Sequence, residues 1–199
     1  EPAAKDYRGG KGGVFEKVEG TVRPYAGANG AFRLMINFAD CLKMTQYVYG
    51  FANVSLGDIA KVERGKRITK SETKDRGKYP VFCGSLNPLG YLDEWNFPGD
   101  RVLVINKGNA GDIGYRRERF FAGERCFVLT ASEYVIPKYL YHYLCSRRGD
   151  LKHRVSGVIP CLKTVDLENF PVILPPLEKQ IEIVNRLNVA ESYLAGVGK

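Results

Sequence analysis

The sequence contains few of the features that mark zinc sites, secreted proteins or membrane spans. Its 199 residues include only two histidines, His142 and His153, and no Cys-x-x-Cys pair, so ligand spacing predicts no metal site. The five cysteines are odd in number and widely spaced, which favours small core residues in a reducing compartment. No apolar run approaches the roughly 18 residues that span a bilayer, and the start, residues 1–5, does not resemble a signal peptide. We therefore expect a cytoplasmic protein with no membrane contact.

Motifs of nucleic-acid enzymes are also scarce. An adenine methyltransferase would need an Asn-Pro-Pro-aromatic motif and a glycine-rich cofactor loop, but Asn87–Gly90 lacks the second proline and the aromatic residue. No GxGxxG follows an expected strand. A nuclease would have to combine Asp58 with the Glu-x-Lys of 72–74, a short pattern that often arises by chance. We expect no catalytic residue and no cofactor, although a recognition module of a larger enzyme with recognition, methylation and cleavage on one polypeptide stays open.

Positive charge is the clearest feature that is present. Lysine and arginine number 30 against 22 acidic residues, which gives a formal net charge of +8 and an isoelectric point of about 9.2. In a soluble chain this excess favours an acidic partner, most commonly nucleic acid. A hydrophobic fraction of 44% and a length of 199 residues allow one sizeable core with an appendage.

Two apolar runs, Val102–Ile105 and Cys126–Leu129, organise the expected fold because they read as paired strands of a buried sheet. Gly108, Gly111 and Gly114 would supply positive φ angles or close approaches in the turns. Further strands are expected at 79–83, 91–92 and 170–174, short helices at 56–62, 137–145 and 163–168, and a longer helix at 177–194. In the helix at 137–145, Leu140, Tyr143 and Leu144 fall at helical spacing, with Tyr139 and Tyr141 on its flanks. The predicted class is mixed α+β, a small twisted sheet with short helices followed by a C-terminal helix of coiled-coil type.

The segment from Lys61 to Lys78 is the most basic one, with eight cations and three acids. Most charge runs are solvated loops, but the accompanying glycine and hydroxyl residues favour phosphate contacts. A second basic run, at 147–154, precedes a loop at 156–160 that is a further candidate contact. Trp95, the only tryptophan, is expected to anchor the core or its rim rather than to stack on a base.

Hydroxyl and amide side chains suited to base edges occur in the loop at 84–90 and at the tip of the expected turn after Ile105. Arg116, Arg117 and Arg119 follow on the next strand, so the rim of the sheet is expected to present cations and amides. The candidate DNA-binding residues are Lys66, Arg67, Thr69, Lys70, Ser85, Asn87, Lys107, Asn109, Arg116, Lys152, Arg154, Ser156 and Lys163.

We expect three parts along the chain: an extension at 1–53 of unassigned role that packs on the main domain, the main domain at 54–176, and a helix at 177–199. The resemblance described next implies that the second part is a recognition domain and the third the start of a dimerisation or spacer helix. The helix carries apolar residues at alternating spacings of three and four, a coiled-coil seam that needs a partner from this chain or from another copy. The partner-helix residues are Leu177, Ile181, Ile183, Val184, Leu187 and Leu194.

The order of several short motifs over residues 54–190 resembles one target recognition domain of the DNA-specificity subunit of type I restriction-modification systems. The motifs are Leu56–Ala60 followed by Gly65 and Lys66, Tyr79–Phe82 with Gly84, Gly90 and Tyr91, Lys107–Gly111, Tyr139–Tyr141, and Leu174–Gln180 with Ile183 and Leu187. Each motif is weak alone, and the proline-proline-glutamine helix start is the most specific. Residues 1–53 match nothing in that family.

The resemblance implies a chain that recognises double-stranded DNA without catalysis of its own. In that family two mixed α/β recognition domains, joined by long antiparallel helices, each read half of a bipartite site, while methyltransferase and restriction subunits dock on the chain. Only one such domain is visible here, so the resemblance implies a half-subunit or a fragment, and a homodimer through the C-terminal helix would rebuild the pair.

An RNA-binding module is the remaining alternative, because Gly108–Gly111 imitates a GXXG backbone clamp. Such a clamp should join two helices. Here it follows an apolar run at 102–105, so the pattern favours a hairpin turn.

Overall fold

The computed structural model describes residues 52–197. Packing divides the whole chain into one unit of Glu1–Met35 and a second of Ile36–Lys199, so every described residue belongs to the second unit. The expected extension at 1–53 lies outside the described residues except for its last two, which begin the first described strand. Its role and packing therefore stay predictions.

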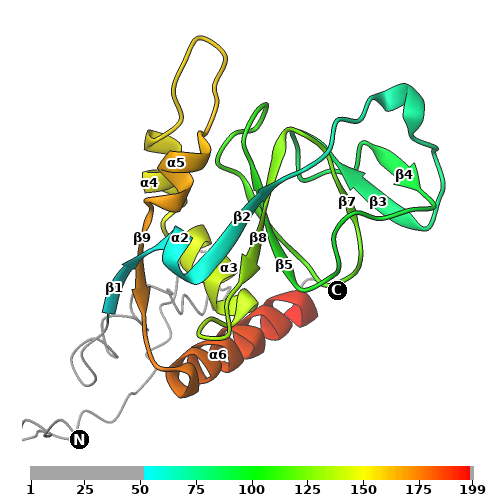
Figure 1. The fold of residues 1–199 in the computed structure, drawn as a ribbon. Coiled ribbons are helices and arrows are strands. Elements are labelled where there is room, and N and C mark those ends of the chain that lie inside the picture. The colour runs from blue at the N-terminus through cyan, green and yellow to red at the C-terminus, as the bar shows by residue number, and fades with distance from the viewer. Residues whose placement is uncertain (1–51, 198–199) are drawn as a thin grey trace, which may run out of the picture. The chain divides into compact units, whose positions relative to one another are not determined.

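Strands and short helices alternate along the described chain, and a long helix ends it (Figure 1). In order they are β1 (Ala52–Ser55), α2 (Leu56–Ile59), β2 (Ala60–Arg64), η1 (Lys70–Glu72), β3 (Tyr79–Phe82), β4 (Gly90–Leu92), β5 (Arg101–Ile105), β6 (Ile113–Arg116), β7 (Phe121–Ala122), β8 (Cys126–Ala131), α3 (Pro137–Ser146), α4 (Arg148–His153), α5 (Thr164–Glu168), β9 (Pro171–Leu174) and α6 (Leu177–Val197).

The centre of the fold is an antiparallel sheet in the order β2-β8-β5-β6. The two predicted apolar strands are confirmed as neighbours, since Val102 pairs with Leu129 and Ile105 with Cys126. Side chains on one face, such as Val104, pack with the helices. Those on the other face, such as Leu103, pack toward the three-stranded sheet that contains β3 and β7. Burial of both faces explains why these strands are continuous apolar runs rather than alternating ones.

Two smaller sheets flank the central one, so the expected single sheet is in fact three. In the order β4-β3-β7, strand β3 pairs antiparallel with β4 and parallel with β7. The predicted last strand, β9, pairs with β1 and with no other strand of residues 52–197. The helix predicted at 56–62 ends at Ile59, and Ala60–Arg64 form strand β2. A helix followed by a basic loop was predicted there, because the charged side chains of Lys61, Glu63 and Arg64 hide the signal of a strand at the edge of its sheet.

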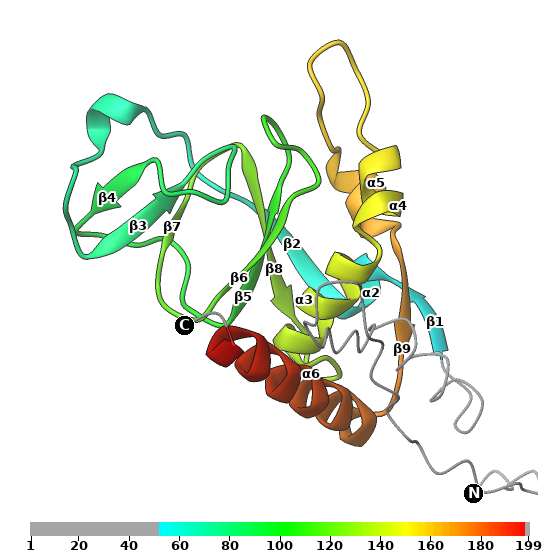
Figure 2. The same cartoon turned by 180° about the vertical axis from the view of Figure 1, so that it is seen from behind.

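Helices cover the face of the central sheet that is opposite the β4-β3-β7 sheet, as Figures 1 and 2 show from front and back. Helix α3 begins with Pro137 and buries Leu140, Tyr143 and Leu144, as predicted. Tyr139 was expected at the flank of this helix but is fully buried, and its hydroxyl donates to the carbonyl of Ile173 at 2.7 Å. The helix therefore buries a wider face than the sequence suggested.

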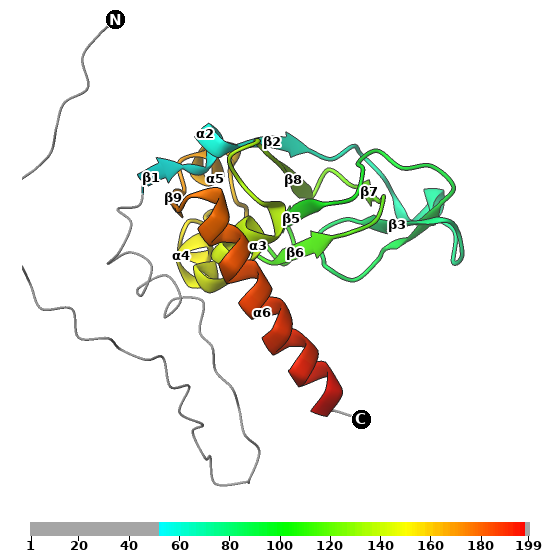
Figure 3. The same ribbon diagram turned by 90° about the horizontal axis from the view of Figure 1, so that it is seen from below.

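Helix α6 lies along α3 and runs past the end of the sheet (Figure 3). Gln180 in its first turn is fully buried and donates to the carbonyls of Tyr134 and Pro175, at 2.9 and 2.8 Å, while accepting from the N–H of Ile136 at 2.8 Å. This bonding explains the glutamine of the proline-proline-glutamine motif, which locks α6 to the start of α3. No helix within 52–197 has the length and apolar character needed to cross a membrane.

Candidate nucleic-acid interface

Five connecting segments meet at one end of the strands of the central sheet, the upper side of the molecule in Figure 1. They meet there because β5 ends, and β6 and β8 begin, at this end of the sheet. These segments carry most of the candidate residues. We call this surface the loop edge and define it as residues 64–70, 83–89, 106–112, 123–125 and 155–163.

Backbone hydrogen bonds join the segments of the loop edge to one another. The N–H of Lys66 donates to Ala122 at 3.0 Å, that of Asn109 to Gly84 at 3.0 Å, and that of Leu162 to Asn106 at 2.9 Å. Side chains in these loops are consequently presented from fixed positions rather than from independent coils.

Two glycines allow the closest of these approaches. Gly84 and Gly108 have φ angles of 78° and 87°, in the left-handed region where other residues are strained. A Cβ added to Gly108 would lie 2.6 Å from the carbonyl oxygen of Gly84. Asn109, which follows directly, is therefore positioned by a turn that only glycine permits.

Seven of the thirteen candidates are exposed on the loop edge and have no side-chain hydrogen bond or ion pair to another residue of 52–197. Charge and amide groups of this kind are the ones that contact phosphates and base edges in protein–DNA interfaces. They are Lys66, Arg67, Asn87, Lys107, Asn109, Ser156 and Lys163.

Arg116 is used inside the protein instead. Its guanidinium stacks on the ring of Phe82 at 3.7 Å and donates to the carbonyl of Leu86 at 3.1 Å, and burial lowers its pKa. This side chain braces the loop at 83–89 and is partly buried. Charge in the sequence does not distinguish such a brace from a surface cation.

The basic run at 147–154 is likewise partly neutralised by the chain. Arg154 donates to the carbonyl of Asp166 at 3.1 Å and lies 5.2 Å from the ring centre of Phe170. Lys152 and Arg148 share the carboxylate of Asp112, with 3.4 Å between Lys152 Nζ and Asp112 Oδ1. Arg154 is therefore structural, whereas Lys152 remains about half exposed beside the edge.

Three other candidates make local contacts within their loops. Thr69 bonds to Glu72 through both its N–H and its hydroxyl and so caps η1. The ammonium of Lys70 donates to the carbonyl of Leu89 at 2.6 Å, and the hydroxyl of Ser85 accepts from the N–H of Asn87 at 2.9 Å. These contacts shape the loops that carry Lys66 and Asn87.

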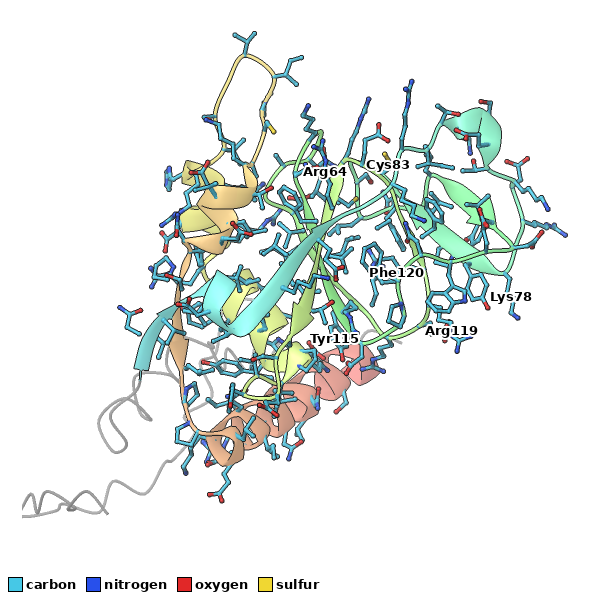
Figure 4. All side chains as sticks on the ribbon, in the orientation of Figure 1. Arg64, Lys78, Cys83, Tyr115, Arg119 and Phe120 are labelled. Atoms are coloured by element: carbon cyan, nitrogen blue, oxygen red, sulfur yellow. The ribbon has the colours of Figure 1, made fainter. Side chains whose placement is uncertain are left out.

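The prediction that Arg117 and Arg119 continue the rim was wrong. Strand β6 runs away from the tip, so Arg101 pairs with Arg116 at the far end of the hairpin. Figure 4 shows Arg119 beside Lys78, away from the loop edge, and Arg64 close to it. The Arg119 guanidinium lies 4.8 Å from the ring centre of Trp95, which is 41% exposed and so belongs to the rim rather than the core.

Sequence reasoning missed two cations of the loop edge. Arg64 lies at the end of β2, and its Nε donates to the carbonyl of Glu124 at 2.9 Å. Arg125 is exposed in the β7–β8 turn, and its stem covers Gly84, where an added Cβ would lie 3.3 Å from Arg125 Cδ. The turn residues Gly123 and Glu124 were the available signal for the position of Arg125.

The acids of the nuclease-like pattern serve as helix caps. Asp58 accepts from the N–H of Ser55 at 3.1 Å, and Glu72 accepts from that of Thr69 at 2.7 Å. The Thr69 hydroxyl, and after it this N–H, lower the pKa of Glu72. Within 52–197 no three His, Cys, Asp or Glu side chains gather as a metal site would require. Gly108–Gly111 lies in the β5–β6 hairpin, as predicted, and not between helices.

The seam of α6 is largely satisfied within the chain. Ile183, Val184 and Leu187 are buried in the main core, whereas Leu177 and Ile181 are 42% and 49% exposed. The side chain of Leu194 lies outside those described. The seam therefore divides into a buried face and a shorter exposed row.

The sequence and the fold have counterparts among known proteins. Residues 49–194 match the family model described as the type I restriction modification DNA specificity domain. A Mycoplasma pneumoniae protein provisionally named type I specificity subunit S.MpnORF507P is 30% identical over 135 residues, 65% of this chain and 37% of its own length. The type I restriction enzyme MpnII specificity subunit of the same species is 27% identical over 149 residues, 70% of this chain and 45% of its own length.

Solved structures agree on the fold. The crystal structure of a type I restriction-modification system S subunit from Mycoplasma genitalium superposes with a TM-score of 0.68 at 21% identity, over 76% of this chain and 41% of that one. The chain thus spans less than half the length of each of these proteins.

Proposed function

We propose, from the premise that the chain belongs to the family of type I restriction modification DNA specificity domains, that it recognises a sequence in double-stranded DNA for a type I restriction-modification complex. Methylation and cleavage are then the work of partner subunits. The rest of the proposal concerns which surface meets the DNA and which meets protein.

The loop edge carries the proposal, because it combines unpaired cations with amides on a rigid frame. Lys66, Arg67, Lys107 and Lys163 would contact phosphates and supply most of the affinity, which makes binding strongly dependent on salt. Asn87 and Asn109 would contact base edges, where an amide can form two hydrogen bonds with adenine. Phosphate contacts fix the position of the domain on the duplex so that the amides meet particular bases.

Partner subunits are proposed to act on the DNA because the acids that a nuclease would use are engaged as caps. Asp58 and Glu72 each hold the first turn of a helix through a backbone N–H. A methyltransferase subunit and a restriction subunit would dock on the chain and take their position on DNA from it.

A second copy of the chain is the proposed partner of the exposed row on α6. Leu177 and Ile181 are 42% and 49% exposed and lie one turn apart on the helix, and Val189, 56% exposed, lies farther along it. Pairing of two copies through this row would bring together two recognition domains. Sedimentation of the purified chain tests this point, and a monomer at all concentrations would exclude it.

Selection from a pool of random duplexes by the purified chain tests DNA recognition. We expect enrichment of one sequence, tighter binding of that duplex than of a scrambled one, and no methyl transfer when S-adenosylmethionine is added. Equal affinity for selected and scrambled duplexes, or for single-stranded RNA, would contradict sequence-specific recognition of DNA. Methylation by the chain alone would contradict the assignment of chemistry to partners.

A further inference from the structure

The hairpin at 155–162 carries the most exposed large apolar side chains of the described residues. Val158 is fully exposed and Ile159 is 73% exposed, and both stand at the tip, beyond Gly157 with its φ of 96°. Figure 1 shows this hairpin projecting on the same side as the other segments of the loop edge. Single exposed apolar residues are common, but two adjacent ones at a projecting tip suggest a contact surface.

The base of the hairpin is fixed to the domain. Ser156 and Cys161 exchange backbone hydrogen bonds of 3.1 Å in both directions, and Leu162, fully buried, donates to the carbonyl of Asn106 at 2.9 Å. Lys107 forms a further bridge with Cys161. The hairpin is therefore held beside the β5–β6 turn and moves with it.

Charge around the hairpin indicates what it meets. Exposed cations lie at its base, namely Lys107, Lys163 and Lys152, the last of which also pairs with Asp112. An apolar tip that projects from a positively charged base fits a partner with anions outside and apolar groups within. A DNA major groove has this arrangement, because phosphates line its rims and thymine C5-methyl groups lie on its floor.

The widths of the two DNA grooves decide which of them can admit the hairpin. The major groove, about 12 Å wide, admits a two-stranded ribbon, whereas the minor groove, about 6 Å wide, does not admit one without being opened. The single bridge between Ser156 and Cys161 holds two chain segments side by side, and residues 157–160 turn beyond it. A projection of this two-segment form fits the major groove.

We propose that the hairpin enters the major groove and that Val158 and Ile159 contact thymine methyl groups there. This inference rests on the proposed DNA recognition and adds to it an apolar contribution to sequence preference. The hairpin tip reads thymine, while Asn87 and Asn109 read bases by hydrogen bonding.

The test combines a change in the protein with a change in the DNA. Val158→Ala with Ile159→Ala is compared with the parent on the selected duplex and on copies in which single thymines are replaced by deoxyuridine, which lacks the methyl group. For the parent we expect a loss of about four- to fivefold at one or two thymines, the value of one buried methyl group. The hairpin variant should bind the unmodified duplex more weakly and be insensitive to those replacements.

Val165→Ala is the control, because it removes apolar atoms from a site on α5 that is 61% exposed and lies outside both the loop edge and α6. It should keep the deoxyuridine sensitivity of the parent. Three results would overturn the inference while sequence-specific binding stands. The selected site could lack thymine, the affinity of the parent could be unchanged by every deoxyuridine replacement, or the hairpin variant could lose as much affinity as the parent on those replacements. The inference would also be overturned if the hairpin variant bound DNA like the parent but no longer bound the methyltransferase subunit, since the tip would then contact protein. A parent that prefers no duplex would instead refute the proposed function.

Discussion

The loop edge and the buried face of α6, which packs on α3 and is called the α6 face below, carry the same kinds of residue and use them in opposite ways. On the α6 face Lys138 bonds to Glu191 and Asn188, and the apolar side chains of Ile183 and Leu187 are buried. On the loop edge Lys66 meets no carboxylate within 52–197. The apolar tip of the hairpin there is exposed as well. Groups left unsatisfied by the chain's own fold are those available to a partner.

The same contrast holds among the basic candidate residues. Arg116 and Arg154 stack on Phe82 and Phe170 and donate to carbonyls, so their charge stabilises loops. Lys107 and Lys163, on the loop edge, are exposed. Changes on the α6 face should therefore alter stability, and changes at exposed loop positions should alter binding.

Gln180→Ala should produce the largest effect. It removes three hydrogen bonds at a fully buried position and leaves the carbonyls of Tyr134 and Pro175 without their side-chain donor. At about 1 to 3 kcal/mol for a buried polar group left unpaired, the free energy of unfolding should fall by roughly 3 kcal/mol or more. Urea unfolding measures this, with the exposed Glu178→Ala as control. A loss no larger than that of the control would contradict the role of Gln180 as a lock.

Lys66→Glu with Arg67→Glu should come next, and its effect should fall on binding. Each phosphate contact contributes a salt slope of about 0.9, so losing two should weaken binding roughly fiftyfold at 0.1 M salt and lower the slope by about two. Every duplex sequence should be affected alike. Titration by fluorescence anisotropy at several salt concentrations measures both quantities.

The charge-matched control for that variant is Lys78→Glu with Arg119→Glu, which lies away from the loop edge (Figure 4). It changes the net charge by the same amount. If both double variants weaken binding equally, the effect comes from net charge and the special position of the loop edge is refuted.

Asn109→Ala should have a smaller and more selective effect. Loss of one bidentate base contact should reduce discrimination at one base pair by about 1 to 3 kcal/mol, while affinity for unrelated DNA stays unchanged. Repeating the duplex selection with this variant shows which position relaxes. Asn185→Ala, exposed on α6, should select the parental sequence. An unchanged selected sequence for Asn109→Ala would remove this residue from the base-reading set.

The smallest expected effect concerns His142. Burial lowers its pKa below the ordinary value of 6.5, so the unfolded chain binds a proton at a pH where the folded one does not. The free energy of unfolding should therefore fall as the pH drops below about 6.5. His142→Gln should reduce this slope between pH 7 and 6, whereas the exposed His153→Gln should not. Equal slopes for both variants would contradict this assignment.

Much of the fold could be predicted because burial leaves a periodic signal. The apolar runs at 102–105 and 126–129 marked the central strands, and the spacing of Leu140, Tyr143 and Leu144 marked α3. Strand β2 could not be found, since an edge strand with charged side chains reads as a loop. The division into three sheets depends on long-range pairing, such as β1 with β9, that a local pattern does not contain.

The candidate interface was predicted in part. Charge and turn residues identified the loops that meet at the edge, but not which cations the fold would use internally. Arg116 and Lys66 look alike in the sequence, and only the position of the Phe82 ring makes one of them a brace. The apolar tip at Val158 was overlooked because an apolar residue in a short run predicts burial, whereas here the hairpin holds it in solvent.

Mapping of methylated bases in the native host tests the central claim most directly. The genome is compared with the gene present, deleted, and restored either as parent or as Asn109→Ala. We predict that one sequence motif loses methylation on deletion, regains it with the parent, and is altered at one position by the variant. A methylation pattern that is identical in all four strains would contradict the claim that this chain selects the DNA sequence for its partners.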